Sequence, residues 1–272
     1  MRISPPFMFQ THRSKPLVAA LHLPPSLSYA AFPGVRDALS LVRNDVAVLL
    51  DNGIDAILLE NDNDKPHTLT IDKAQTAWLT RVASEIRNQT RAPVGINVQR
   101  IDWEATFAIA VAAELDFARL DVFVDQVKML EEEVHMDPES VVAYRNRLGG
   151  KGIEIWADVH VKHSEILSKA TIEESSVLAV ESGAAAVLVS GNQTGEAPVN
   201  TDLSRAAAGL RAKNIVAPVI IASGLRPDNA DTLCRLSDGA VVGTCLKEGD
   251  RISKERVQAL VREWDRALAS QR

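Results

Sequence analysis

Short apolar runs recur eight times along the 272-residue chain, and a longer amphipathic segment follows each of them. The runs are apolar almost throughout and do not alternate with polar residues, as in strands that are buried on both faces of a parallel sheet. Strand and helix therefore alternate about eight times, which predicts an α/β fold, a single (β/α)8 TIM barrel. The runs are LVAALHL (17–23), AILLE (56–60), VGINV (94–98), FARLDV (117–122), IEIWADV (153–159), AVLVSG (186–191), PVIIAS (218–223) and GAVVGT (239–244).

The segments between the runs carry signals for helix starts. Asp137 stands before Pro138, which is the order of a capping residue and a proline in the first helical turn. Thr171 and Glu174 have the spacing of a capping box. The segment 251–272 has apolar residues at helical spacing and predicts a final helix.

No linker rich in Pro, Gly or Ser interrupts this alternation. With 46% hydrophobic residues the chain can bury a full core. We therefore expect one barrel domain over residues 1–272, with a short N-terminal extension at 1–15. The alternative is an open doubly wound sheet, but that fold has fewer strands and usually a GxGxxG motif after the first strand, which is absent here.

The charge balance argues against nucleic acid as a partner. The chain has 30 Lys and Arg against 36 Asp and Glu, a formal net charge of −6. The longest stretch without charged residues, 16–35, contains four prolines, so no transmembrane segment is expected. The N-terminus lacks the apolar region of a secretory signal, and the two cysteines suit a reducing compartment. These features predict a cytoplasmic protein.

In a barrel, the polar residues at the carboxyl ends of the strands mark the functional site, because the loops there form the open mouth. The first five runs end in side chains that donate or accept protons, and the last three end in glycines and hydroxyls. The first set contains His22, Glu60, Asn61, Asp62, Asn97, Arg100, Arg119, Asp121, Asp158, His160 and Lys162. The second set contains Ser190, Gly191, Ser223, Gly224, Gly243 and Thr244.

The glycine-rich set predicts an anion site. Backbone N–H groups at glycine turns bind anions, and in such barrels the loops after the seventh and eighth strands often hold a phosphate. We expect a phosphorylated small molecule with its phosphate near Gly224 and Gly243. Its reactive end would face Glu60, Asp121 and Asp158.

The fifth run ends in three titratable residues at alternate positions. In an extended strand Asp158, His160 and Lys162 share one face, and His163 takes the other. This pattern predicts Asp158 at the cavity floor as a general base, acid or metal ligand, with Lys162 at the rim.

Several of these residues have an equally simple structural interpretation. Asp121 stands two residues from Arg119 and is as well explained by an ion pair with it. His22 is as well explained by a hydrogen bond within its own loop. The glycine and hydroxyl pairs could also be tight turns, but three of them in succession at this end of the barrel favour phosphate binding. For Glu60 a functional role is favoured, because a carboxylate that ends an apolar run is costly unless it is used.

A metal site made of Glu60, Asp158 and His160 is a further alternative. No HxH or HExxH motif supports it. No cofactor is therefore predicted, and a divalent metal remains a minority interpretation.

Seven blocks, in order and over nearly the whole chain, together resemble the BtpA/SgcQ family. They are ALHLPPSLSY, LLENDNDKPH, PVGINVQR, FARLDVFV, WADVHVKH, LVSGNQTG and SDGAVVGTCLKEG. The resemblance implies a (β/α)8 barrel of the ribulose-phosphate-binding type. The family takes its name from a role in photosystem I biogenesis, and other members lie among carbohydrate-use genes. The family's ENFGD segment is replaced here by residues 60–64, ENDND.

The last three loops also resemble those of the tryptophan synthase α subunit, on the blocks SGNQTG, ASGLRPDN and DGAVVGT. In that family these loops hold the substrate phosphate. The resemblance implicates Gly195, Ser223, Gly224, Gly243 and Thr244 by position. That enzyme also has a catalytic glutamate at the end of its second strand, where Glu60 stands.

The sequence therefore favours an enzyme that acts on a phosphorylated, sugar-derived molecule by proton transfer, as a lyase or isomerase. Glu60 or Asp158 would be the base. The acid or electrostatic partner would be His160, Lys162 or His22. The same site would include Asn97 and Asp121. The alternative is a non-catalytic assembly factor for a membrane complex such as photosystem I, and the sequence is compatible with a homo-oligomer.

Overall fold

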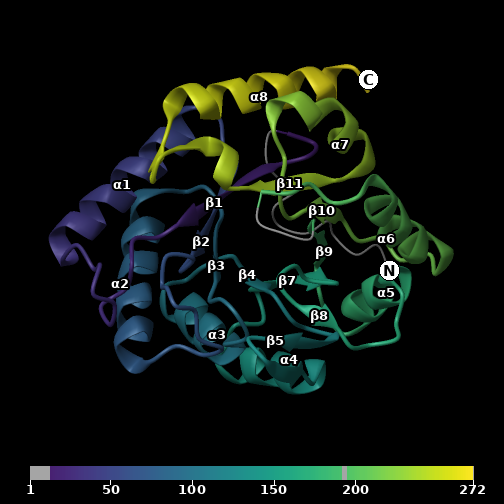
Figure 1. Ribbon diagram of the computed structural model, residues 1–272, viewed down its shortest axis with the longest axis horizontal. Coiled ribbons are helices and arrows are strands. Elements are labelled where there is room, and N and C mark those ends of the chain that lie inside the picture. The colour runs from purple at the N-terminus through teal and green to yellow at the C-terminus, as the bar shows by residue number, and fades with distance from the viewer. Residues whose placement is uncertain (1–12, 192–194, 272) are drawn as a thin grey trace.

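Eight parallel strands close into a barrel in the computed structural model, which describes residues 13–191 and 195–271 (Figure 1). Strand β1 pairs with both β2 and β11, so the sheet has no free edge. Each of the eight predicted runs forms one strand, which confirms the (β/α)8 TIM barrel. The strands, in their order around the barrel, are β1 (Leu17–His22), β11 (Gly239–Val242), β10 (Val219–Ile221), β9 (Ala186–Val189), β7 (Glu154–Val159), β4 (Phe117–Leu120), β3 (Val94–Asn97) and β2 (Ala56–Glu60).

Helices surround the barrel on its outside (Figure 1). The predicted caps form, since Asp137 accepts hydrogen bonds from the backbone of Glu139 and Ser140, and Thr171 and Glu174 make a capping box. The predicted final helix begins later and ends earlier than 251–272. The helices are α1 (Val35–Asp51), α2 (Lys73–Gln89), α3 (Trp103–Ala112), α4 (Pro138–Arg147), α5 (Ile172–Glu181), α6 (Asn200–Ala212), α7 (Ala230–Leu236) and α8 (Lys254–Ala269).

The core has two layers, one between the strands and the helices and one inside the barrel. The inner layer fills the barrel below the mouth, where the rings of Phe117 and Trp156 lie 4.7 Å apart between centroids. A Cβ at Gly95 would lie 2.4 Å from the Phe117 ring, so only glycine leaves room for it there. The barrel interior is therefore solid at this level, and any ligand must bind above it.

Strand register brings polar side chains to one level above this floor. His22 is opposite Glu60, and Glu60 is opposite Asn97. Inward-facing residues alternate along each strand, so the positions after Leu58 and Phe117 on the same face are Glu60 and Arg119. The mouth is thus the direct continuation of the inner apolar face.

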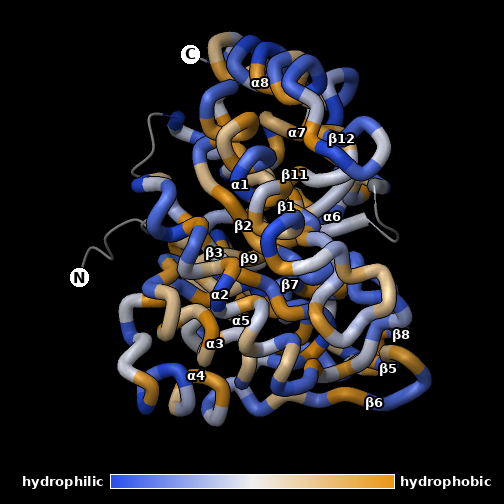
Figure 2. Tube along the Cα trace, turned by 90° about the vertical axis from the view of Figure 1, so that its left-hand side faces the viewer, coloured by the Kyte–Doolittle hydropathy of each residue, from blue (hydrophilic) through white to orange (hydrophobic). Residues whose placement is uncertain are grey.

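A small three-stranded sheet lies beside the mouth and is made of β5 (Gln126–Met129), β6 (Glu132–His135) and β8 (Glu165–Ile166). Its apolar side packs around Val127, Met129 and Val161. Figure 2 shows these strands together at one end of the molecule. The polar residues of β6 are exposed. Because β8 pairs with β5, the sheet ties the loop after β7 to the loop after β4.

A second, two-stranded sheet, β12 (Lys247–Glu248) and β13 (Arg251–Ile252), precedes α8. Of the predicted N-terminal extension, residues 1–12 lie outside the described part. Arg13 is fixed to the barrel by ion pairs to Asp55 at 3.0 Å and Asp265 at 2.6 Å.

Candidate active site

Arg119 is the centre of a buried charge network at the mouth of the barrel. Its side chain points inward from β4 and is 4% exposed. Nε and Nη2 donate to the two oxygens of Asp158 at 2.7 and 3.0 Å, and Nη1 donates to Oε1 of Glu60 at 3.0 Å. Burial by itself lowers the pKa of Arg119, but the two carboxylates outweigh burial and raise it, so the guanidinium stays charged.

Asp158 does not lie on the cavity floor, and that expectation is wrong. Both of its oxygens accept hydrogen bonds from Arg119, and the residue is 1% exposed. It does not line the cavity of the mouth that contains Glu60 and Arg119. Burial raises the pKa of Asp158 and the charge of Arg119 opposes this. The strand pattern placed Asp158 correctly on the inner face but carried no sign that Arg119 from the neighbouring strand β4 reaches it.

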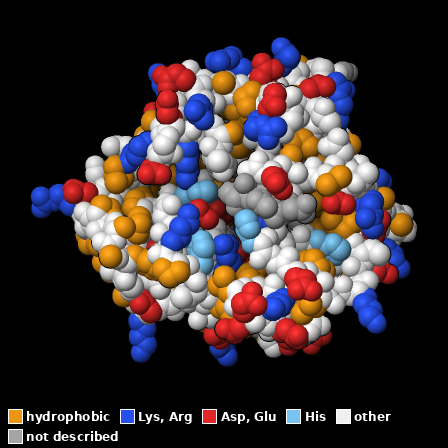
Figure 3. All heavy atoms as spheres, viewed as in Figure 1, with side chains coloured by type: hydrophobic (Ala, Val, Ile, Leu, Met, Phe, Trp, Pro, Cys, Tyr) orange, Lys and Arg blue, Asp and Glu red, His pale blue; other side chains and the backbone are white. Residues whose placement is uncertain are grey.

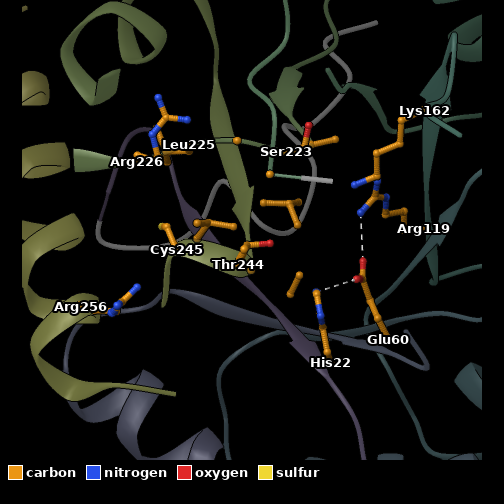
Figure 4. Close-up of a pocket in the computed structure, with 17 residues that line it drawn as sticks. His22, Glu60, Arg119, Lys162, Ser223, Leu225, Arg226, Thr244, Cys245 and Arg256 are labelled. Atoms are coloured by element: carbon orange, nitrogen blue, oxygen red, sulfur yellow. Dashed lines mark hydrogen bonds and ion pairs between the residues drawn. The ribbon is translucent and has the colours of Figure 1, made fainter. Parts of the chain in front are cut away.

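Glu60 connects Arg119 to His22. Its Oε1 accepts from Arg119, and its Oε2 lies 3.6 Å from Nε2 of His22 (Figure 4). The other ring nitrogen of His22, Nδ1, lies 3.2 Å from Oδ2 of Asp62. Burial raises the pKa of Asp62, but the hydrogen bond and charge of His22 outweigh it, so the pKa ends below its usual value. The imidazole is therefore held between two carboxylates, in the arrangement that orients a histidine for proton transfer.

Asn97 and Asp121 form a second polar pair close to Arg119. Nδ2 of Asn97 donates to the backbone oxygen of Arg119 and to Oδ1 of Asp121, both at 3.0 Å. The other oxygen of Asp121 lies 3.9 Å from Arg100. Asp121 therefore has a hydrogen bond with Asn97 and an ion pair with Arg100. The expected ion pair with Arg119 is not formed.

His160 does not continue the inner strand face that carries Asp158, and the extended-strand prediction fails here. Strand β7 ends at Val159, and His160 has the left-handed φ of 49°. Its backbone N–H donates to Asp125 at 2.8 Å, and its ring nitrogen Nε2 lies 3.1 Å from the carbonyl oxygen of Ala170. The chain turns because Asp125 offers this N–H a buried acceptor in place of continued strand pairing. His160 therefore lines a separate cavity, away from Glu60.

One cavity of about 240 Å³ joins the two kinds of residues predicted at the mouth. Figure 3 shows histidine, acidic and basic side chains gathered around a hollow near the centre of this face. On one side the cavity is lined by His22, Glu60, Arg119 and Lys162, and on the other by Gly195, Ser223, Gly224, Gly243 and Thr244 (Figure 4). Gly191 does not line it and instead lines the neighbouring cavity with His160, which has about 250 Å³.

The glycine-rich wall is held by contacts between loops. Gly224 has the left-handed φ of 70°, and a Cβ there would lie 2.0 Å from the backbone nitrogen of Ala197. The Ser223 hydroxyl donates to the carbonyl of Glu196 at 2.6 Å and accepts from the N–H of Gly191 at 2.9 Å. This hydroxyl is therefore engaged in tying loops together. Gly224 has no Cβ because the loop at 195–197 takes that space.

Gly243 connects the two sides of the cavity. A Cβ there would lie 2.9 Å from Nε2 of His22 and 3.3 Å from the carbonyl oxygen of Ala20. Substitution of this glycine would therefore displace the imidazole as well as alter the wall.

Two arginines of the cavity escaped prediction. Arg226 and Arg256 both line the same wall as Thr244. Arg226 pairs with Asp228 at 3.1 Å, and within the described residues Arg256 has no hydrogen bond or ion pair of its own. Arg226 follows β10 closely, so its position after a strand could have predicted it at the mouth. Arg256 lies in the first turn of α8, and no sequence pattern indicates that it reaches the cavity. The wall therefore holds two arginine side chains in addition to the glycines.

Cys245 also lines this wall. Burial raises the pKa of its thiol to about 11, so it is protonated at neutral pH.

The three residues considered as metal ligands, Glu60, Asp158 and His160, do not come together in one site. Over residues 13–191 and 195–271 no group of three His, Cys, Asp or Glu side chains is placed to hold a metal ion.

The fold and this mouth define a barrel protein whose polar site lies at the carboxyl ends of parallel strands. The family model of the BtpA family matches residues 13–266. The protein PH1209 of Pyrococcus horikoshii is 34% identical over 244 residues, covering 89% of this chain and 91% of that one. The chain therefore belongs to the BtpA family.

A further relative is named photosystem I biogenesis protein BtpA, from Synechocystis. It is 29% identical over 269 residues, covering 96% of this chain and 91% of the relative.

Solved structures of low sequence identity share the fold. Thiamine phosphate pyrophosphorylase from Pyrococcus furiosus matches with a TM-score of 0.57 and 18% identity, over 94% of this chain and 97% of that one. Phosphoribosyl anthranilate isomerase from Thermus thermophilus matches with a TM-score of 0.55 and 16% identity, over 95% and 100%. At these identities the likeness concerns the barrel alone.

None of the helices described for this chain combines the length and apolar character needed to cross a bilayer.

Proposed function

We propose that this barrel is an enzyme that binds a phosphorylated, sugar-derived small molecule and transfers a proton on it, as a lyase or isomerase. The observation that carries the proposal is the single cavity that joins the His22–Glu60–Arg119 network to a wall of glycines and arginines. A small ligand can contact both sides at once.

The wall with Arg226 and Arg256 would hold the phosphate. Arginine binds phosphate through charge-assisted, often bidentate hydrogen bonds. Arg256 has no carboxylate to neutralise it among the described residues, and the Thr244 hydroxyl lines the same wall. Gly195, Gly224 and Gly243 leave the backbone accessible to an anion beside these cations.

The opposite wall would carry the proton transfer. Asp62 holds Nδ1 of His22, which leaves Nε2 directed toward Glu60 and the cavity. Arg119 donates to Oε1 of Glu60 at 3.0 Å and so fixes the carboxylate with its other oxygen, Oε2, on the side of His22. We assign Glu60 as the base and His22 as the acid, and a positioned pair of this kind contributes roughly 10² to 10⁴ in rate.

The two solved structures with the same fold are both of enzymes named after phosphorylated compounds, thiamine phosphate and phosphoribosyl anthranilate, which is in keeping with this proposal. Cys234 and Cys245 are both unpaired, which accords with the proposed cytoplasmic location.

The test is thermal unfolding of the protein with sugar phosphates and with the same sugars lacking phosphate. A ligand at about one hundred times its Kd adds about 2.7 kcal/mol to the free energy of unfolding. We expect only phosphorylated compounds to raise the midpoint. Thr244→Glu places a negative charge on the phosphate wall and should abolish the shift, whereas Ser40→Glu, on the exposed face of α1, should keep it.

Glu60→Gln separates binding from catalysis. The glutamine oxygen can still accept from Arg119, so this variant should keep the phosphate-dependent shift and lose turnover. Normal turnover by Glu60→Gln would refute the assigned base. A full panel without any shift would refute phosphate binding.

The name of the Synechocystis relative favours a second candidate, a non-catalytic factor for assembly of a membrane complex. In that case substitutions in the cavity would be silent. Substitutions at the exposed residues of segment 131–135, which includes strand β6, would instead impair assembly.

A further inference from the structure

Lys162 lies where three cavities of the mouth meet. It lines the main cavity with Glu60 and Arg119, a small cavity with Asp121, and the cavity that contains His160. Figure 4 shows the side chain of Lys162 extending toward Arg119 and the cavity. The side chain is thus part of the proposed active site although the strand pattern that pointed to it fails.

The backbone around Lys162 is anchored on both sides. Val161 is buried in the apolar cluster of the small sheet, and the N–H of His160 is bound by Asp125. Beyond it, β8 pairs with β5. The amine is therefore presented to the cavity by a fixed loop, which is what a residue that reacts with a ligand requires.

The amine of Lys162 has no hydrogen bond and no ion pair within the part of the chain that the structure describes. The nearby carboxylates are engaged elsewhere, Asp158 by Arg119 and Glu60 by Arg119 and His22. Over residues 13–191 and 195–271, no salt bridge therefore fixes the amine in its charged form. Burial lowers the pKa of Lys162 and the charge of Arg119 lowers it further, against the opposing effect of Glu60, Asp158 and Asp121.

We propose that Lys162 forms a covalent imine with a carbonyl carbon of the substrate, which makes the substrate a phosphorylated aldehyde or ketone. The inference rests on the proposed function, because the phosphate wall must hold the other end of the molecule. A desolvated lysine next to another cation is an activated nucleophile of this kind. Arg226 and Arg256 line the wall opposite Lys162. The carbonyl carbon of the substrate would therefore lie at the end of the cavity with Lys162, and its phosphate at the end with the arginines.

The reaction needs no oxidant or reductant. The nitrogen lone pair of the neutral amine adds to the carbonyl carbon, the π electrons move to oxygen, and one proton passes from nitrogen to that oxygen. A second proton, supplied by His22, lets the oxygen leave as water and leaves a C=N⁺ bond to Lys162. That cation stabilises a carbanion at the adjacent carbon, from which Glu60 removes the proton.

The test is trapping of the imine with sodium borohydride in the full-length protein. The probe is glyceraldehyde 3-phosphate at one equivalent per chain, with glyceraldehyde and glycerol 3-phosphate beside it. Intact mass counts the adducts, and peptide mass spectrometry locates them. We expect one adduct at Lys162 with glyceraldehyde 3-phosphate and at least about tenfold less with glyceraldehyde, which lacks the charged contacts.

Two lysine variants make the test specific. Lys162→Arg keeps the charge but has no amine that condenses with a carbonyl, so the adduct should disappear. Lys247→Arg is the matched control. Burial also lowers the pKa of Lys247, but this lysine does not line the cavity that contains Glu60 and Lys162. It should leave the adduct at Lys162 unchanged.

The outcomes separate this inference from the proposed function. If glycerol 3-phosphate raises the unfolding midpoint but no adduct forms at Lys162, the imine is wrong and phosphate binding stands. If no phosphorylated probe shifts the midpoint and adducts scatter over exposed lysines, both are wrong. An adduct that persists in Lys162→Arg and is lost in Lys247→Arg would also overturn the assignment.

Discussion

The two sides of the mouth are built by opposite means. The side formed by β1, β2, β3, β4 and β7 is held by side chains, in the chain of contacts Asp158–Arg119–Glu60–His22–Asp62. The side formed by β9, β10 and β11 is held by backbone approach, with Gly224 against the loop at 195–197. The first side should lose stability when a charge loses its partner, and the second side should lose stability when an atom is added to a glycine. Substitutions on each side therefore test the two sides separately.

The largest expected effect is on the charged side. Arg119→Met leaves Asp158, which is 1% exposed, without its cation, and an unpaired buried charge of this kind costs about 3–5 kcal/mol. We expect a loss of that size in the free energy of unfolding, measured by urea denaturation. Arg205→Met removes an exposed arginine from its pair with Glu173 and should leave the free energy of unfolding nearly unchanged, because solvent screens a surface pair. Equal losses in the two variants would contradict the comparison.

The next effect is on the glycine side. Gly224→Ala places an alanine in the left-handed region of φ, which lowers the free energy of unfolding by roughly 1–2 kcal/mol. Its Cβ would also meet Ala197 at 2.0 Å, and forcing an extra group into packed structure costs about a further 1–3 kcal/mol.

Gly249→Ala is its matched control. Gly249 has a similar φ of 59° but no heavy atom within 4 Å of an added Cβ. It should therefore show the conformational cost alone in the same urea experiment. If Gly249→Ala loses as much stability as Gly224→Ala, contact with the loop at 195–197 does not hold this wall.

The smallest effect concerns pH and sharpens the role of Asp62. Its folded pKa is lowered, so the stability it contributes is present above the unfolded value, about 3.9, and is lost as the pH falls below it. Asp62→Asn removes the group that titrates. We expect the unfolding midpoint of the variant to fall less steeply than that of the wild type between about pH 5 and pH 3. Parallel curves would show that His22 does not hold this carboxylate.

The residues differ in how far the sequence could place them. His22, Glu60 and Asn97 were expected at the mouth because each ends an apolar run, and strand register puts them at one level. His160 followed the same logic and was misplaced, since the strand ends at Val159. Local alternation predicts a side chain's direction only while the backbone stays extended.

The barrel, its eight strands and the end of the barrel where polar residues gather could all be predicted from the sequence. These depend on apolar runs and caps, which are properties of neighbouring residues. Tertiary contacts were needed to show that Arg119 pairs with Asp158, that Asp62 holds His22 and that Arg256 reaches the cavity from α8. They also show that Lys162 has no hydrogen bond or ion pair among the described residues. The reason is physical: a charge is satisfied by whichever group folding brings within about 3–4 Å, and these groups come from strands and helices far apart in the chain.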